Sequence, residues 1–490
     1  MKQGMGLQKV TAPRAPGHRG SMATFTLEEI AGATGGSMRG ETGAVASGVS
    51  TDSRAAAQGE LFVALRGERF DGHDFVAASA ARGVGIFLVD DAWFASHPLP
   101  AGSSAVVVPD TLRALGDLAA WHRRRFKITV VAVTGSNGKT TTKEMLARIL
   151  TQTGPGLKTE GNLNNLIGLP LTLLRLTGRE RWAVLELGMS AFGEIDRLAE
   201  IAGPDVGIIT NAFPAHLETL GSVEGVARAK GELFLRLAPG AWAVYNVDDP
   251  LVSKCPAPSN VTRLTFGLRG AEVSSASIKS LGKRGESFTL RLPSGEQPVL
   301  LSAFGRHNVY NALAAAAAAH ALGVPGETIR LGLEEFTPYD KRFQLEEFSG
   351  VVLIDDSYNA NPASMAAALE TLREVREEGR AAAVLGDMLE LGPGTEAAHR
   401  ELGRLAAGCV ERLYLLGEQA GQVADGALGA GFDPEALLMA QDHEELSREL
   451  LAWVQPGDCV LVKGSRGMRM ERVAQAVRDA FAAPAQGGND

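Results

Sequence analysis

Residues 128–146 read ITVVAVTGSNGKTTTKEML. The apolar run 128–133 is typical of a buried strand in a parallel sheet. A turn with two glycines follows, and Lys139 with three threonines then begins a helix. Gly135 and Gly138 permit backbone conformations that turn N–H groups inward, and a helix N-terminus favours an anion. The stretch therefore predicts a loop that binds the phosphates of a nucleotide, between a strand and a helix.

The loop is a shortened variant of the common phosphate-binding pattern G-x-x-x-x-G-K-[ST]. Val133 stands where that pattern has its first glycine. We expect Lys139 to supply a positive charge to the phosphates and the Thr140 hydroxyl to ligate Mg²⁺. The residues expected to contact ATP along this loop are Thr134, Gly135, Ser136, Asn137, Gly138, Lys139, Thr140 and Thr141.

The remaining strands and helices predict an α/β protein. Apolar runs at 183–187, 206–210 and 241–245 alternate with helical stretches, which indicates a doubly wound parallel sheet in a central domain like that of P-loop ATPases. Alternating residues around 261–303, with Pro293-Ser294-Gly295, favour an antiparallel hairpin. After Pro338, apolar runs again alternate with helical stretches, which predicts a second, Rossmann-like domain. These runs are at 351–355, 382–386, 412–417 and 459–463. Shorter runs before residue 109 predict a small N-terminal α/β domain.

Length and composition agree with several domains. A chain of 490 residues, 45% hydrophobic and 21% charged, is too long for one core and apolar enough for three. We expect an N-terminal domain at 23–108, a central domain at 109–338 and a C-terminal domain at 339–490, after a disordered extension at 1–22. A net charge of −9 argues against nucleic acid as a partner.

The cysteines and the N-terminal segment point to the cytoplasm. Cys255, Cys409 and Cys459 lie far apart without metal-binding spacing, so we interpret them as reduced, buried thiols. Residues 1–22 lack the apolar core of a signal peptide, and Met22 is a candidate for the natural start. The chain has no segment long and apolar enough for membrane insertion. Nothing in the sequence requires more than a monomer.

Two further residues follow predicted strands of the central domain. Glu186 ends the strand at 183–187, at the edge where open α/β sheets bind ligands, and is a candidate Mg²⁺ ligand. Its alternative is a strand-end carboxylate facing solvent. His216 follows the strand at 206–210, where a lone loop histidine is more often structural than catalytic.

The loop at 134–140 resembles that of the Mur ligase and folylpolyglutamate synthase superfamily, and the resemblance covers nearly the whole chain after residue 22. It implies that Glu186 and His216 bind Mg²⁺, two ions in all, near a carbamylated Lys230 that also serves the metal. Without the resemblance, Lys230 would be interpreted as a surface charge. Lys139, Glu186, His216 and Lys230 are thus the expected catalytic residues.

Residues 305–313 resemble the superfamily's G-x-H-N-x-x-N-A segment, in which Asn308 would contact the adenine side of ATP. The alternative is an asparagine that caps an alanine-rich helix. Arg342 resembles the arginine that lies against the phosphates. The usual Pro-Gly-Arg is replaced by Pro338-Tyr339-Asp340-Lys341-Arg342, so Lys341 is the competing candidate.

The C-terminal segments 355–362, 386–392 and 463–466 resemble the branch of the superfamily that adds D-alanyl-D-alanine. The discriminating feature is Tyr358-Asn359, where related enzymes have Ala-His. The resemblance implies that Asp356 contacts ATP and that the incoming dipeptide meets Tyr358, Asn359 and Asn361.

Two N-terminal segments resemble the family's elements that recognise a UDP-sugar, and one central segment resembles its central-domain substrate loop. They are residues 51–54, with Ser53 and Arg54, residues 67–74, and residues 161–165, with Asn162 and Asn165. From the residues alone, both N-terminal segments would be solvated turns.

The resemblance implies an ATP-dependent ligase with UDP-N-acetylmuramoyl-tripeptide and D-alanyl-D-alanine as substrates. It would form an acyl phosphate and then the pentapeptide precursor of peptidoglycan. The nearest alternative is another amide ligase of the superfamily that adds one amino acid or glutamate. A nucleotide-binding switch or kinase and a non-catalytic scaffold are the other classes, and the sequence lacks the Asn-Lys-x-Asp motif of GTPases.

Overall fold

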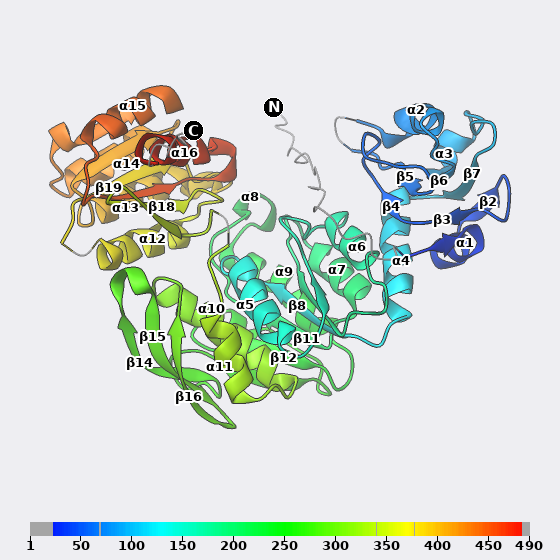
Figure 1. Cartoon of the computed structure of the whole chain (residues 1–490), viewed down its shortest axis with the longest axis horizontal. Coiled ribbons are helices and arrows are strands. Elements are labelled where there is room, and N and C mark those ends of the chain that lie inside the picture. The colour runs from blue at the N-terminus through cyan, green and yellow to red at the C-terminus, as the bar shows by residue number, and fades with distance from the viewer. Residues whose placement is uncertain (1–22, 68–69, 340, 377, 483–490) are drawn as a thin grey trace, which may run out of the picture.

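The computed structural model describes residues 23–67, 70–339, 341–376 and 378–482, so the expected extension at 1–22 lies outside the described residues. Figure 1 shows an N-terminal α/β part at one end of the molecule, a central part, and a C-terminal α/β part at the other end. The α/β class and the order of these parts agree with the sequence prediction. The boundaries at 108/109 and 338/339 stay predictions.

The N-terminal part is built on a small, mostly parallel sheet with the order β2-β7-β6-β5-β4, in which β2 alone runs antiparallel to its neighbour. These strands are β2 (Ser37–Arg39), β4 (Val49–Ser50), β5 (Leu61–Val63), β6 (Ile86–Asp90) and β7 (Ser104–Val108). Beside it lie the pair β1 (Phe25–Thr26) and β3 (Val45–Ala46), with the helices α1 (Leu27–Thr34), α2 (Val76–Ala81) and α3 (Asp91–Phe94).

The central part is built on a parallel sheet with the order β13-β12-β11-β8-β10-β9. The strands are β8 (Thr129–Thr134), β9 (Gly156–Lys158), β10 (Trp182–Glu186), β11 (Val206–Ile209), β12 (Trp242–Asn246) and β13 (Thr262–Phe266). Its helices are α4 (Thr111–Arg124), α5 (Lys139–Thr151), α6 (Gly168–Leu173), α7 (Glu194–Ala202), α8 (Leu217–Leu220), α9 (Val223–Leu235), α10 (Arg306–Ala321) and α11 (Gly326–Glu334).

Alternation along the central strands sends apolar side chains to two separate cores. Val131 and Val133 of β8 pack with Met145 of α5 and with the alanines of α10, whereas Ala132 packs on the opposite face with Leu198 of α7 and Val226 of α9. Helices therefore cover both faces of the sheet, as expected for the doubly wound arrangement.

The predicted hairpin is present as a small antiparallel sheet, β14 (Ser274–Ser280), β15 (Glu286–Leu292) and β16 (Gly295–Leu301), with Leu292 opposite Gly295 at its turn. The first strand of the region 261–303, in which the hairpin was expected, does not belong to the hairpin. This strand, β13, joins the parallel sheet beside β12.

The C-terminal part has the strand order β17-β18-β22-β19-β20-β21, parallel except for the edge strand β17. The strands are β17 (Gln344–Phe348), β18 (Val351–Asp356), β19 (Ala381–Gly386), β20 (Arg412–Leu416), β21 (Leu437–Ala440) and β22 (Cys459–Lys463). The helices are α12 (Pro362–Val375), α13 (Thr395–Ala406), α14 (Ala420–Gly429), α15 (His443–Trp453) and α16 (Glu471–Phe481). A search of the described residues finds no helix with the length and apolarity to cross a membrane.

Candidate active site

The glycine turn joins β8 to α5 as the sequence predicts. Gly135 and Gly138 have φ of 153° and 81°, in the region that side chains disfavour. A Cβ at Gly135 would collide with the Thr210 hydroxyl, and one at Gly138 would collide with the Asn311 amide. Both positions therefore require glycine for conformation and for space.

Residues at the end of β11 fix the shape of the turn. The Thr210 hydroxyl donates to the Asn137 carbonyl at 2.6 Å, and the Asn137 N–H donates to the Asn211 side chain at 2.8 Å. The first N–H groups of α5 follow directly after Gly138, where helix N–H groups have no intrahelical acceptor and suit an anion. Thr134 contributes differently: its buried hydroxyl donates to the Leu187 carbonyl at 2.9 Å and ties β8 to the end of β10.

Lys139 lies folded over the turn. Its Nζ donates to the Gly135 carbonyl at 2.8 Å. Burial lowers the pKa of Lys139, while the Glu186 carboxylate raises it and Arg342 lowers it again. An amine held in this way can exchange a backbone carbonyl for a phosphate oxygen without leaving the turn.

Glu186 forms a buried cluster with the first turn of α5. Its carboxylate accepts from the Thr140 hydroxyl at 2.7 Å and from the Asn164 amide at 2.8 Å. Burial acts to raise the pKa of Glu186, but Lys139, Arg342 and other nearby donors outweigh it, so the pKa lies below its usual value. The structure thus excludes the alternative of a carboxylate facing solvent, because Glu186 is only 2% exposed. A charged carboxylate beside a threonine hydroxyl suits a Mg²⁺ ion.

Lys230, from α9, is buried beside the same turn. Its side chain lines a cavity of about 20 Å³ together with Lys139, His216 and Gly135. Burial, and next the charge of Lys139, hold the pKa of Lys230 well below its usual value. The interpretation of Lys230 as a surface charge is therefore wrong, and a neutral buried amine is the form that can react with CO₂.

His216 precedes α8 and faces the C-terminal part. Its Nδ1 lies 2.7 Å from Oε2 of Glu390, which follows β19. The contact with His216 is the main cause of a lowered pKa at Glu390. Glu390 belongs to the quoted segment 386–392, but no role was predicted for it, because nothing local in the sequence points to His216.

Arg342, rather than Lys341, faces the nucleotide loop. The Arg342 guanidinium lies 3.9 Å from the centre of the Tyr358 ring, which makes it a cation–π contact. The Lys341 ammonium lies 3.8 Å from the Glu471 carboxylate on α16. This arrangement favours Arg342 as the phosphate-facing residue.

The other C-terminal candidates lie at the ends of β18 and β22. Asp356 accepts from the Lys463 ammonium at 2.6 Å, and Lys463 also donates to the Asn359 carbonyl at 2.9 Å. Asn361 caps α12 by accepting from the Ser364 N–H at 2.9 Å. The Asn361 amide also donates to Asn137 of the glycine turn at 2.6 Å, so the two parts of the molecule meet at this pair.

A cavity of about 1450 Å³ lies between the central and C-terminal parts. Predicted residues that line it are Ser136, Asn137, Gly138, Lys139, Thr140, Thr141, Asn162, Asn165, Glu186, His216, Asn308, Arg342, Asp356, Tyr358, Asn359 and Asn361. Asn308 donates to the Phe304 carbonyl and accepts from Asn311, so it also serves its own helix. Asn164 and Lys463 also line the cavity, although the sequence analysis assigned no role to either residue. Asn164 lies in the expected substrate loop at 161–165, but only the fold brings it to Glu186.

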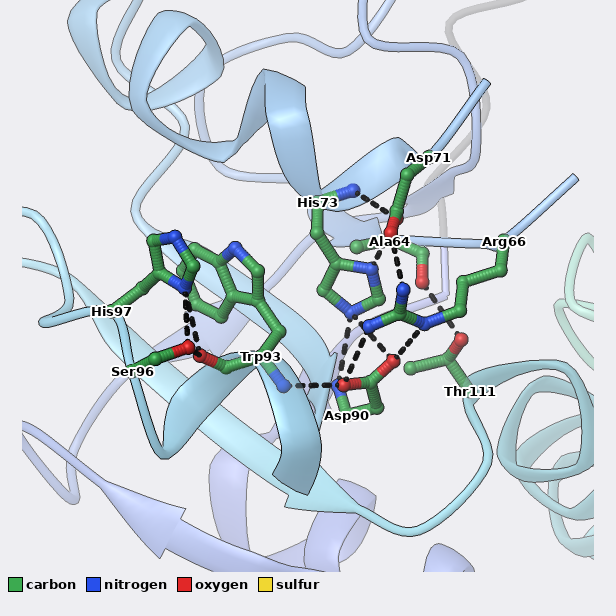
Figure 2. Close-up of polar contacts among 9 residues, drawn as sticks. All are labelled: Ala64, Arg66, Asp71, His73, Asp90, Trp93, Ser96, His97 and Thr111. Atoms are coloured by element: carbon green, nitrogen blue, oxygen red, sulfur yellow. Dashed lines mark hydrogen bonds and ion pairs between the residues drawn. The ribbon is translucent and has the colours of Figure 1, made fainter. Parts of the chain in front are cut away.

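The N-terminal candidates do not line this cavity. Arg54 pairs with Asp52 at 2.7 Å, and the Ser53 carbonyl accepts from Arg82. Figure 2 shows the second segment, where Arg66 donates to Asp90 at 2.6 Å and lies 2.5 Å from Asp71.

His73 completes this network. Its Nδ1 lies 2.6 Å from Asp71 and its Nε2 accepts from the Asp90 N–H at 3.0 Å (Figure 2). Because the ring is buried and both of its nitrogens are engaged, residues 71–74 form an ordered turn rather than a freely solvated one.

A parallel sheet with a glycine turn, a buried lysine and a buried carboxylate at the ends of its strands defines a nucleotide-binding α/β protein. Comparison with known proteins specifies the class further. Residues 133–319 match the Mur ligase middle domain, residues 341–466 the Mur ligase glutamate ligase domain, and residues 45–123 the catalytic domain of the Mur ligase family.

Curated relatives match over almost the whole chain. The UDP-N-acetylmuramoyl-tripeptide--D-alanyl-D-alanine ligase of Escherichia coli K12 is 39% identical over 94% of this chain and 99% of the relative. The protein of that name from Bacillus subtilis 168 is 38% identical over 89% of this chain and 93% of the relative. The chain therefore belongs to the Mur ligase family, whose members are ATP-dependent ligases that form amide bonds.

Solved structures agree in fold. A crystal structure of MurF from Acinetobacter baumannii superposes with a TM-score of 0.87 at 35% identity, covering 94% of this chain and 100% of that one. The MurF ligase of Thermotoga maritima in complex with ADP superposes with a TM-score of 0.79 at 30% identity, covering 89% of this chain and 97% of that one.

Proposed function

We propose that the protein joins D-alanyl-D-alanine to UDP-N-acetylmuramoyl-tripeptide and so makes the pentapeptide precursor of peptidoglycan, with ATP cleaved to ADP and phosphate. The observation that carries this proposal is the cavity between the two parts, where the glycine turn and Glu186 face Arg342 and Tyr358. The full-length match to ligases of that name supports the choice of substrates. We place the protein in the cytoplasm, as a monomer, as the sequence analysis expects.

The reaction needs ATP because forming an amide from a carboxylate and an amine in water is uphill. The terminal carboxylate of the tripeptide attacks the γ-phosphorus, and ADP leaves. The resulting acyl phosphate gives the dipeptide amine a carbonyl carbon with a good leaving group. Attack by that amine forms a tetrahedral intermediate, which collapses with loss of phosphate and a proton. No protein nucleophile takes part.

The positive charges of Lys139 and Arg342 would offset the negative charge of the phosphates. Phosphoryl transfer spreads negative charge over the transferring group, and catalysis consists mostly of positioning and electrostatic stabilisation. Lys139 sits on the turn, while Arg342 reaches the same place from the C-terminal side, where Tyr358 stacks on it. Asn308 would contact the adenine, and Asp356 would lie near the nucleotide on the far wall.

The proposed residues for Mg²⁺, two ions in all, are Thr140, Glu186, His216 and Lys230. The fit rests on the oxygen pair of Thr140 and Glu186 and on the imidazole and buried amine that share the small cavity. Bound Mg²⁺ would neutralise phosphate charge and hold the phosphates in line. Lys230 fits that role as a carbamate, because a neutral amine that reacts with CO₂ becomes an anion.

The substrates would divide among three domains, with boundaries at 23–108, 109–338 and 339–490. Ser53, Arg54 and the ordered turn at His73 would hold the UDP-sugar, and Asn162 and Asn165 would guide its peptide toward the glycine turn. Tyr358, Asn359 and Asn361 would receive the dipeptide. Closure of these domains would exclude water that otherwise hydrolyses an acyl phosphate.

The test compares acceptors in one assay. Phosphate release from ATP is measured with UDP-N-acetylmuramoyl-tripeptide and, in turn, D-alanyl-D-alanine, D-alanine and glutamate. We expect rapid release and a pentapeptide product only with the dipeptide. Turnover with a single amino acid would instead select another amide ligase of the family.

A further inference from the structure

One contact between the central and C-terminal parts involves His216, which is one of the proposed metal residues. His216, at the start of α8, and Glu390, after β19, approach to 2.7 Å between Nδ1 and Oε2. The contact is an ion pair by distance, without the alignment of a hydrogen bond. His216 also lines the small cavity that contains Lys139 and Lys230, so Glu390 touches a residue of the phosphate site from outside.

The backbone at both residues is unusual. His216 has φ of 53° and Glu390 has φ of 64°, which is the left-handed region that non-glycine residues avoid. Such conformations persist where the surroundings enforce them, and they cluster at functional sites. The Glu390 side chain is 56% exposed and that of His216 is 34% exposed, so the pair contributes little to stability as an ion pair.

The C-terminal part holds the Glu390 turn rigidly. The Met388 N–H donates to Nε2 of His399 at 2.9 Å, and His399 is fully buried. The Leu389 N–H donates to the Ser465 hydroxyl at 2.9 Å. Ser465 donates in turn from its own N–H to the Asp387 carbonyl at 3.0 Å. These hydrogen bonds tie residues 387–389, directly before Glu390, to the C-terminal sheet.

We propose that Glu390 is a positioning residue, which orients the His216 ring toward the phosphates only when the C-terminal part is docked. The Glu390 carboxylate lies against Nδ1, so Nε2 remains the ring nitrogen available to the site; once the pair aligns as a hydrogen bond, Glu390 would orient the ring as carboxylates orient histidines beside metal ions. Docking of the dipeptide-binding part would thereby complete the phosphate site. This inference rests on the proposed function.

Three variants test the inference: Glu390→Gln, which removes the charge, Glu390→Asp, which keeps the charge on a shorter arm, and Glu396→Gln, an exposed change on α13, as control. Losses from residues that orient metal-binding histidines are typically 10- to 100-fold. We expect kcat to fall about tenfold or more in Glu390→Gln, with the KM for the UDP-sugar unchanged, and part of the loss restored in Glu390→Asp.

Metal binding supplies a readout besides activity. Mn²⁺ is titrated by electron paramagnetic resonance into each variant with a non-hydrolysable ATP analogue and both peptide substrates. We expect about tenfold weaker Mn²⁺ binding in Glu390→Gln than in wild type or Glu396→Gln. Equal affinity and equal kcat in Glu390→Gln and wild type would overturn the inference, while ligation by the wild type would leave the proposed function standing.

A double-mutant cycle shows whether Glu390 acts through His216. If it does, Glu390→Gln adds no further loss of kcat in a His216→Ala background. Independent, multiplying losses would contradict the inference. A wild-type protein that ligates nothing would instead overturn the proposed function.

Discussion

Lys139 illustrates how one side chain serves both the turn and the proposed chemistry. Its ammonium is bonded to the Gly135 carbonyl and lies in the field of Glu186, so it is in place before a nucleotide arrives. Preorganised charge of this kind needs little rearrangement at the moment of reaction.

Lys139→Ala should therefore lower ATP turnover by about 10²- to 10³-fold, the loss typical of removing one preorganised donor. The fold should remain, because the turn is held mainly by Thr210 and Asn211. Circular dichroism checks the fold and a coupled phosphate assay checks turnover. Unchanged ATP turnover would rule out this loop as the phosphate site.

The surroundings of Lys230 support a specific chemical proposal, namely that its amine is carbamylated. Burial, and next the charge of Lys139, hold the pKa of Lys230 well below its usual value, and the neighbouring cavity of about 20 Å³ has room for a molecule about the size of water.

Protein equilibrated with ¹³C-bicarbonate should show a carbamate carbon by NMR, and Lys230→Arg should lack it, because a guanidinium stays charged. Lys254→Arg is the matched control at a lysine outside the site. A carbamate signal that persists in Lys230→Arg, or none in wild type, would contradict the assignment.

At the scale of single residues, the sequence predicted where a side chain lies when the signal was local, while the roles of these residues stay predictions. Thr140 and Lys139 follow from one short motif, and Glu186 from its place at a strand end. Contacts such as Asn164 with Glu186, or Glu390 with His216, join segments that meet only in the folded chain, so no spacing in the sequence reveals them.

At the scale of elements, α12 connects two functions. Asn361 caps the helix through Ser364 and reaches Asn137 of the glycine turn with the other end of its amide. The sequence predicted Asn361 as a substrate contact, which stays a prediction, while its role as a cap follows from the Asn-Pro start of the helix.

Asn361→Ala should loosen the first turn of α12, since losing such a cap costs about 1 kcal/mol. Asn361→Asp should keep the cap but lose the N–H donated to Asn137. Hydrogen exchange of the amides of residues 363–366 should rise in the alanine variant and remain near wild type in the aspartate variant. Equal protection in all three proteins would show that the cap is unimportant.

Buried parallel strands were predictable, whereas edge strands were not. β8, β10 and β11 are continuous apolar runs, and the structure places each within one or two residues of its expected bounds. β17 and β13 lie at sheet edges and mix polar with apolar residues. Their partners, rather than their composition, make them strands.

At the scale of the whole molecule, the site is divided between two parts that must separate and meet. The central part carries the glycine turn, the C-terminal part carries Arg342 and Tyr358, and the cavity lies between them. Substrates have to enter and products have to leave, so opening belongs to each cycle.

A disulfide tests this motion. A Cβ at Gly392 would lie 3.6 Å from Cγ of Glu218, close to where the Sγ of a cysteine at 218 would lie, so Glu218→Cys with Gly392→Cys can form a disulfide across the gap, at the cost of a side chain at the left-handed φ of 59°. The native cysteines Cys255, Cys409 and Cys459 are buried. We expect the oxidised protein to lose most multiple-turnover activity and to regain it with reductant. Full activity while locked would contradict the need for opening.

The central claim is that the terminal phosphoryl group of ATP passes to the carboxylate of the tripeptide. The most direct measurement labels that carboxylate with ¹⁸O and analyses the released phosphate by mass spectrometry during ligation to D-alanyl-D-alanine. Because the bridging oxygen leaves with phosphorus, we predict one ¹⁸O atom in each phosphate. Unlabelled phosphate, or ATP left intact with both substrates present, would contradict the account.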